Sequence, residues 1–254
     1  MLINPSTYTG WIAPHSIEWY AQLGKQVGRY RYPWKSTVDE PNGETVFTEE
    51  VSKTVPGLNV LDVGCGDGGF ALSWSSIVNQ IVGFDITEDF LPKEGVPPNV
   101  KFVSGNLKVG MPFDEDSFDC AYNRKGPTSA YHDLLRVVRG GGQVIGLHPG
   151  DDISKELSEW YPDFFDPIPT ATPILQILQD RLSSYRHADI RLISSTEYLQ
   201  SPVDVILMRT FGQKAAIFEE CLKSLKEITQ IFERHATDKG LPITYSRYLV
   251  KAIV

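Results

Sequence analysis

A glycine-rich segment flanked by aspartates is the part of this sequence best suited to bind a ligand. Residues 60–70 have the sequence Val-Leu-Asp-Val-Gly-Cys-Gly-Asp-Gly-Gly-Phe, in which an apolar run leads into a series of glycines that starts at Gly64. Glycines allow a sharp backbone turn and a close approach to a bound molecule. A second apolar run ends at Asp85, 21 residues after Gly64, the spacing at which a carboxylate can bind ribose hydroxyls. The two segments predict a nucleoside site.

The charges around these glycines decide which nucleoside is expected. Gly64, Gly66 and Gly69 also satisfy the G-x-G-x-x-G pattern of dinucleotide sites, where the loop holds an anionic pyrophosphate. Asp62 and Asp67 flank the glycines and would repel a diphosphate. They would attract S-adenosylmethionine, which carries an ammonium and a sulfonium and no phosphate. The charges therefore favour this cofactor over a nicotinamide dinucleotide.

The same segment resembles the first motif of class I S-adenosylmethionine-dependent methyltransferases, of the type 11-like group, and Asp85 resembles their ribose carboxylate. Further resemblances follow in order along residues 104–107, 111–119 and 134–145, which correspond to the adenine-side segment and to the approaches to the fourth and fifth strands. The chain departs from the family where glycine replaces the usual proline before the glycine pair at 141–142, and where Asn106 replaces a frequent aspartate. An amide can still hydrogen-bond to an exocyclic amine.

The resemblance implies a set of residues around S-adenosylmethionine, and around S-adenosylhomocysteine as its product. An N-terminal segment often covers the cofactor in this family, and an arginine there can pair with the cofactor carboxylate. The expected cofactor-binding residues are Asp62, Gly64, Cys65, Gly66, Asp67, Gly68, Asp85, Ile86, Gly105, Asn106, Leu107, Asn123 and Arg31.

Polar residues at the ends of the expected fourth and fifth strands are the candidates for chemistry, because ligands of open α/β sheets lie at the carboxyl ends of the strands. His148 titrates near neutral pH and is the candidate to remove a proton from the acceptor; the alternative is a hydrogen bond to a backbone carbonyl. Asn123 is expected near the cofactor or the substrate, or as a turn cap. Arg124 and Lys125 could bind an anionic acceptor or form a solvated charge pair. The histidines show no metal-ligand spacing, and no metal is expected.

Hydrophobic patterning predicts the elements that must position these residues. Apolar runs alternate with amphipathic segments, which is typical of a Rossmann-like α/β fold. We expect seven strands in a mostly parallel sheet, helices on both faces and an antiparallel C-terminal strand. The expected strands are 58–63, 80–84, 100–103, 118–122, 143–147, 190–194 and 246–254, and the expected helices are 16–27, 45–54, 70–78, 128–139, 154–160, 173–183 and 215–236.

The whole chain, residues 1–254, is expected to be one methyltransferase domain. Within it, residues 1–57 would form a helical lid, 58–149 the cofactor-binding core, and 150–254 the substrate-side helices and last strands. The aromatic loop at 160–169 is expected to line an acceptor pocket or to pack on the surface.

Composition limits the partners. A net charge of −8 and an isoelectric point near 5.2 oppose a large nucleic-acid-binding face. Three separated cysteines indicate a reducing compartment, and no signal peptide or membrane span is evident, so a cytoplasmic location is expected. A homodimer is compatible with the sequence.

The expected function is therefore transfer of a methyl group to an oxygen or nitrogen atom of a small-molecule acceptor. Two alternatives stay open. Residues 137–149 resemble bacterial rRNA guanine-N1 methyltransferases, which carry an N-terminal zinc module, although residues 1–57 contain no cysteine. The other alternative is a protein that binds S-adenosylmethionine without turnover.

Overall fold

The computed structural model describes residues 2–92, 94–167 and 172–254, and the chain forms two compact units. The first unit contains Met1–Asn42, Asp152–Ala171 and Ser194–Tyr245; the second contains Gly43–Asp151, Thr172–Ile193 and Ser246–Val254. The glycine-rich segment and Asp85 both belong to the second unit.

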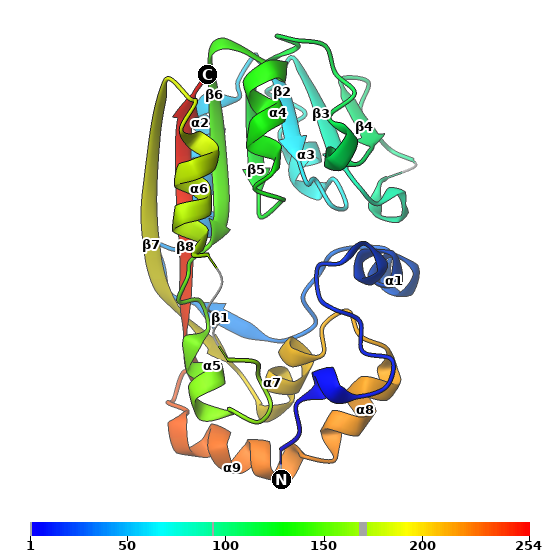
Figure 1. The fold of residues 1–254 in the computed structure, drawn as a ribbon, viewed down its shortest axis with the longest axis vertical. Coiled ribbons are helices and arrows are strands. Elements are labelled where there is room, and N and C mark those ends of the chain that lie inside the picture. Colours follow the sequence, from blue (N-terminus) through cyan, green and yellow to red (C-terminus); the bar gives the residue numbers. More distant parts are fainter. Residues whose placement is uncertain (1, 93, 168–171) are drawn as a thin grey trace. The chain divides into compact units, whose positions relative to one another are not determined.

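An eight-stranded sheet has the order β1-β7-β8-β6-β5-β2-β3-β4 (Figure 1). Strands β2 to β6 pair in parallel, while β8 is antiparallel to β6 and β1 is antiparallel to β7. The fold class is as expected, but the expected strand number was one too low, because β1 has three residues and shows no pattern of its own. The strands are β1 Ser36–Val38, β2 Asn59–Val63, β3 Gln80–Asp85, β4 Val100–Ser104, β5 Phe118–Arg124, β6 Val138–Pro149, β7 His187–Leu199 and β8 Leu241–Ile253.

The sheet of the second unit is covered on both faces because its strands are apolar on both sides. Neighbouring residues of β5 show this: Ala121 packs in one cluster with Leu134 and Leu178, while Tyr122 packs in the other with Phe47. The first cluster is covered by α4 and α6, and the second by α2 and α3. The helices are α1 Ile17–Val27, α2 Gly43–Thr54, α3 Gly69–Ser73, α4 Ala130–Val137, α5 Lys155–Trp160, α6 Ile174–Leu182, α7 Pro202–Arg209, α8 Ala215–Leu222 and α9 Leu225–His235, with short 3₁₀ turns at Pro5–Thr7, Glu88–Phe90 and Leu107–Val109.

Two expected helices were wrong in length. The helix predicted over 70–78 ends at Ser73. The single helix predicted over 215–236 is two helices, separated at Lys223 and Ser224, where Ser224 leaves helical geometry at φ −93° and ψ 8°. The apolar residues keep helical spacing across this break, so their periodicity concealed it.

The first unit has its own core, and α1 buries Trp19 and Leu23. Ser16 caps this helix by accepting a hydrogen bond from the backbone amide of Trp19 at 3.1 Å, as the sequence predicts. The indole of Trp19 is buried and donates to the carbonyl of Phe211 at 3.1 Å. Of the loop expected to line an acceptor pocket, Tyr161 and Phe164 are buried in this core; residues 168 and 169 lie outside the described residues.

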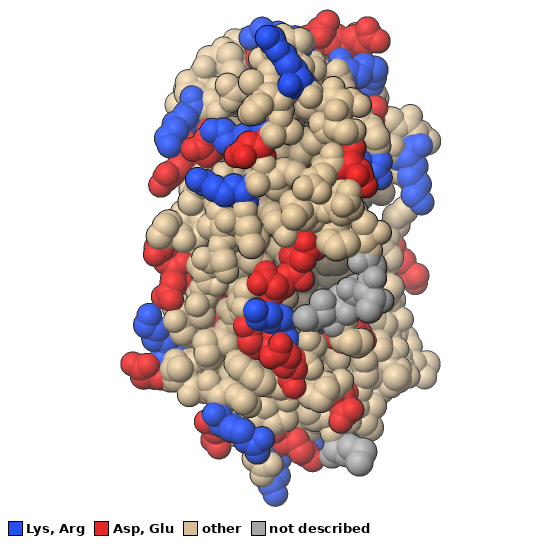
Figure 2. Space-filling model, turned by 60° about the vertical axis from the view of Figure 1, so that its left-hand side comes forward, with Lys and Arg blue, Asp and Glu red and all other residues tan. Residues whose placement is uncertain are grey.

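The surface carries charges of both signs. Lysine and arginine side chains are interspersed with aspartate and glutamate over the face seen in Figure 2. Within the described ranges, no helix has the length and apolar character needed to cross a bilayer, and no cluster of metal-ligating side chains is found.

Candidate cofactor site

The bend after β2 is built from glycines in a conformation that other residues rarely adopt. Gly64, Gly66 and Gly68 have φ values of +72°, +55° and +70°. The amide of Gly64 donates to the carbonyl of Phe84 at 2.8 Å, and the amide of Gly68 donates to the carbonyl of Cys65 at 2.9 Å. Left-handed φ values are accessible to glycine without the steric cost of a Cβ atom. The sequence therefore specifies a tight, fixed turn at the carboxyl end of β2.

Close contacts add a second requirement for glycine. A Cβ atom on Gly68 would lie 2.4 Å from the ring of Phe102, and one on Gly64 would lie 2.9 Å from the Cα atom of Gly126. The bend is thus packed between β4 and the loop after β5. A ligand can approach its backbone closely because no side chain leaves these positions.

Asp85 is fixed against this bend. Its carboxylate accepts hydrogen bonds from the amides of Gly66 at 2.9 Å and Thr87 at 3.0 Å. Burial raises the pKa of Asp85 despite these bonds. Ile86, the next residue, keeps 38% of its surface exposed. The structure thus brings together the bend, the carboxylate expected to bind ribose and an exposed apolar side chain beside them.

Asp62 is a buried carboxylate in β2, two residues before the bend. It is 1% exposed and accepts a hydrogen bond from the Tyr122 hydroxyl at 3.1 Å. Burial raises its pKa to about 7, and the hydrogen bond and the charge of Arg124 only partly oppose this. No lysine or arginine forms an ion pair with Asp62 among the described residues. A buried carboxylate without a cationic partner is well suited to a positively charged ligand.

The remaining residues of the bend contribute its shape. Cys65 is buried, which raises the pKa of its thiol, and a Cβ atom on Gly83 would meet its sulfur at 2.9 Å. Asp67 accepts a hydrogen bond from the amide of Gly69 at 3.1 Å, at the start of α3. Cys65 therefore packs toward β3, while Asp67 caps the turn.

The segment after β4 lies beside Asp85. The amide of Gly105 donates to the backbone carbonyl of Asp85 at 2.9 Å, and a Cβ atom on Gly105 would meet the ring of Phe84 at 2.6 Å. The Asn106 side chain accepts from the amide of Lys108 at 2.9 Å and so caps the short turn that begins at Leu107. The predicted adenine-side segment thus adjoins the predicted ribose carboxylate.

Asn123 is fully buried at the end of β5. Its Nδ2 atom donates to the carbonyl of Pro127 at 3.0 Å, and its Oδ1 atom has no hydrogen-bond partner among the described residues. A Cβ atom on Gly126 would lie 2.6 Å from that oxygen. Asn123 therefore holds the loop whose glycine touches Gly64, and its free oxygen is an acceptor beside the bend.

Arg124 and Lys125 have a partner that the sequence did not reveal. Each lies 2.8 Å from a carboxylate oxygen of Glu44 in α2, and the guanidinium of Arg124 stacks 4.6 Å from the ring centre of Phe70. Burial opposes the ionisation of Glu44, but Lys125 and Arg124 outweigh it and hold its pKa below the ordinary value. The pair therefore has a structural role before any role in binding an anionic acceptor.

His148 lies deeper than its position at a strand end suggests. It is 1% exposed, and its Nε2 atom is 2.9 Å from the hydroxyl of the fully buried Tyr131. Burial lowers its pKa to about 4, so the imidazole is neutral at pH 7. The hydrogen bond joins it to a side chain, whereas the alternative predicted from sequence was a backbone carbonyl. Its role as a base stays a prediction, as does the pairing expected of Arg31, which belongs to the first unit.

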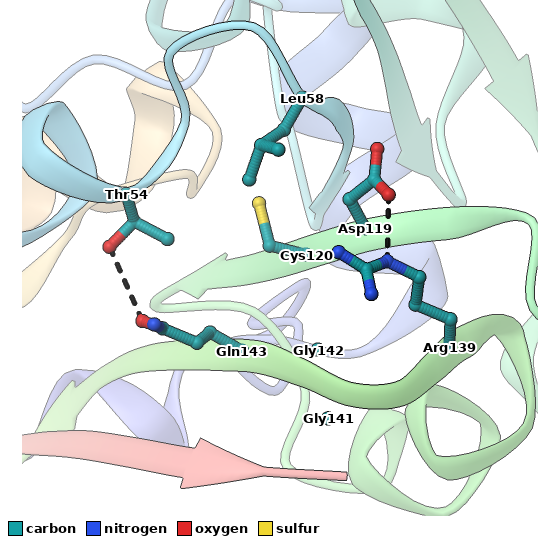
Figure 3. Close-up of a pocket in the computed structure, with 8 residues that line it drawn as sticks. All are labelled: Thr54, Leu58, Asp119, Cys120, Arg139, Gly141, Gly142 and Gln143. Carbon is teal, nitrogen blue, oxygen red and sulfur yellow. Dashed lines mark hydrogen bonds and ion pairs between the residues drawn. The ribbon is translucent and has the colours of Figure 1, made fainter.

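A small pocket lies at the opposite ends of the strands (Figure 3). It encloses about 110 Å³. Arg139 donates to Asp119 at 2.8 Å, and Asp119 also accepts from the amide of Asn59 at the start of β2, so both charges are already paired. Ligands of open α/β sheets lie at the carboxyl ends of the strands, and this pocket therefore has a structural rather than a ligand-binding character. Its lining residues are Thr54, Leu58, Asp119, Cys120, Arg139, Gly141, Gly142 and Gln143.

Comparison with known proteins agrees with the geometry of the bend. The profile of the methyltransferase domain family Methyltransf_11 matches residues 61–146, the range from β2 to β6 that contains the bend, Asp85 and Asn123. Residues 61–146, about a third of the chain, thus correspond to a methyltransferase domain.

Individual relatives share this region. The ubiquinone/menaquinone biosynthesis C-methyltransferase UbiE of Pseudomonas putida is 30% identical over 174 residues, which cover 61% of this chain and 66% of that protein. The sterol 24-C-methyltransferase ERG6B of Gibberella zeae is 35% identical over 107 residues, which cover 37% of this chain and 28% of that protein. The structure of the YcgJ protein of Bacillus subtilis is 20% identical, with a TM-score of 0.55, and covers 83% of this chain and 97% of that one. The YcgJ structure shares the fold of this chain. The match to UbiE spans slightly less than two thirds of the length of that relative.

Proposed function

We propose that this protein transfers the methyl group of S-adenosylmethionine to a carbon atom of a small organic acceptor. The observation that carries the proposal is the joint position of the glycine bend and Asp85, whose carboxylate is fixed 2.9 Å from the amide of Gly66. The family of the domain supplies the cofactor. The relatives named as C-methyltransferases support carbon as the acceptor atom, in place of the oxygen or nitrogen expected from the sequence.

The residues of the site fit this cofactor. Glycines without side chains leave the bend open. In the proposed complex, Asp85 accepts hydrogen bonds from the ribose hydroxyls, and Asp62 and the Oδ1 atom of Asn123, which has no partner among the described residues, accept from a cationic amine. The bound cofactor supplies a methyl group on a sulfonium, which is already a good leaving group. The contribution of this chain is then to fix the cofactor, to orient the acceptor and to exclude water.

Carbon methylation also requires an electron-rich acceptor, which loses a proton before or after the transfer. The acceptor is itself acidic, or a side chain of the protein takes the proton. His148 is buried and bonded to Tyr131. We therefore favour an acceptor that is itself acidic, in which ionisation of a phenol or an enol activates the carbon atom that is methylated.

A methyl-transfer assay with isotopically labelled cofactor tests the proposal. Quinols, sterols, phenols, carboxylic acids and amines are offered in parallel, and NMR of the product locates the new methyl group. We expect a new carbon–carbon bond on an ionisable ring or enol. A methyl group on oxygen or nitrogen would refute the carbon assignment, and failure of the protein to bind either the cofactor or S-adenosylhomocysteine would refute the proposed function as a whole.

A further inference from the structure

The edge strand β7 is open along its first half. β1 pairs with β7 only at residues 197–199, and β8 lies on the other side of β7. Along residues 187–193, no strand in the described part of the chain lies on the outer side, as the position of β7 in Figure 1 shows. An open row of backbone donors and acceptors favours pairing with a further strand.

The sequence of this stretch lacks the residues that block an edge most strongly. Residues 187–193 are His-Ala-Asp-Ile-Arg-Leu-Ile, without proline or lysine, and the two charges in the stretch, on Asp189 and Arg191, are of opposite sign. Leu192 is 48% exposed. The side chains of Asp189 and Arg191 are also exposed, and neither forms an ion pair or side-chain hydrogen bond within the described ranges. Two opposite charges, two residues apart on one face, suit a partner that presents the same two charges in reverse order.

A second copy of this chain is that partner. In an antiparallel pair related by a two-fold axis, the residue on the axis lies opposite itself, and its neighbours lie opposite each other in reverse order. An axis at Asp189 or Arg191 would place like charges opposite each other. An axis closer to residue 187 or to residue 193 would place one of the two charges opposite a residue outside the open stretch. An axis at Ile190 alone places each Asp189 opposite the partner's Arg191.

We propose that β7 pairs with β7 of a second copy, antiparallel and centred on Ile190, so that the two sheets become continuous. The pairing then places Ala188 opposite the partner's Leu192, which covers that exposed side chain. A hollow of about 400 Å³ adjoins this part of β7 and is lined in part by His187, Asp189 and Lys251. This surface is independent of the cofactor site.

Charge exchange tests this pairing without disturbing the core. Asp189→Arg places two arginines on each strand, and Arg191→Asp places two aspartates, so each variant alone repels its own copy. Sedimentation velocity of the full chain should show a dimer for the original protein and an association at least about tenfold weaker for each variant. The double variant D189R/R191D restores both pairs and should dimerise again. Equal thermal midpoints and circular dichroism spectra establish that the variants are folded.

Mixing the two single variants gives the sharpest result. Asp189→Arg and Arg191→Asp chains present complementary charges to each other, so an equimolar mixture should form a heterodimer although each alone is monomeric. The proposal is overturned if the original protein remains monomeric at about 100 µM. It is also overturned if the single variants dimerise as well as the original protein, because the contact would then lie elsewhere.

Discussion

Replacing Asp62 by asparagine should change how stability depends on pH. The folded protein holds this carboxyl in a fully buried position where burial raises its pKa from 3.8 to about 7. The unfolded chain releases the proton near the lower value. Between these two pH values the folded state binds more protons than the unfolded state, so the free energy of unfolding falls as pH rises through this window. Asparagine keeps the shape of the side chain and does not titrate.

The size of the effect follows from the shift. A rise in pKa from 3.8 to about 7 corresponds to at most about 4 kcal/mol, at 1.36 kcal/mol per pKa unit. Chemical denaturation of both proteins at pH values from about 4 to about 8 measures it. The stability of D62N relative to the original protein should increase across this range by an amount approaching that limit, because only the original protein must ionise a buried carboxyl.

Asp119→Asn is the matched control. Hydrogen bonding by the amide of Asn59 lowers the pKa of Asp119, with a further contribution from Arg139. A carboxyl with a lowered pKa contributes stability above its unfolded value of 3.8 and loses it only as pH falls below that value. The stability of this variant relative to the original protein should therefore stay nearly constant from about pH 4 to about pH 8. Parallel stability curves for D62N and the original protein from pH 4 to 8 would refute the reasoning about Asp62.

Two further variants test the packing around the site. Gly68→Ala places a Cβ atom 2.4 Å from the ring of Phe102, whereas Gly57→Ala, at a similar φ of +74°, meets nothing within 4 Å. Calorimetry should show weakened binding of S-adenosylhomocysteine for G68A alone. Equal affinities of the two variants would contradict the role of this contact. Tyr131→Phe removes the hydroxyl that bonds to His148 and should lower the free energy of unfolding by about 1–3 kcal/mol, as measured in urea; an unchanged midpoint would show that the bond contributes no net stability.

The cofactor-binding half of the fold could be predicted from sequence because its signals are local. Gly64 and Gly68 occur where a strand must turn sharply, and Asp85 ends the next apolar run at the expected spacing. A local signal also succeeds in the first unit, where Ser16 caps α1 because a hydroxyl placed just before an apolar helical pattern satisfies a free amide. In each case residues close in sequence determine the geometry.

The remaining features depend on contacts between distant segments. His148 ends an apolar run, but only the packing of α4 against β6 places Tyr131 on it. In the sequence, Arg124 and Lys125 resemble a free basic pair. Their partner Glu44 lies in α2, about 80 residues earlier in the chain, and only the fold brings it to them. Sequence periodicity does not predict such contacts between distant side chains, because the tertiary fold determines them.

Isothermal titration calorimetry with S-adenosylhomocysteine, and in parallel with a nicotinamide dinucleotide, tests the central claim most directly. That claim is that the bend between β2 and α3, with Asp62 and Asp85 beside it, binds a nucleoside that carries an ammonium group rather than a diphosphate. We predict micromolar binding of S-adenosylhomocysteine and no measurable heat with the dinucleotide. Binding of the dinucleotide, with none of the sulfur nucleoside, would contradict the account.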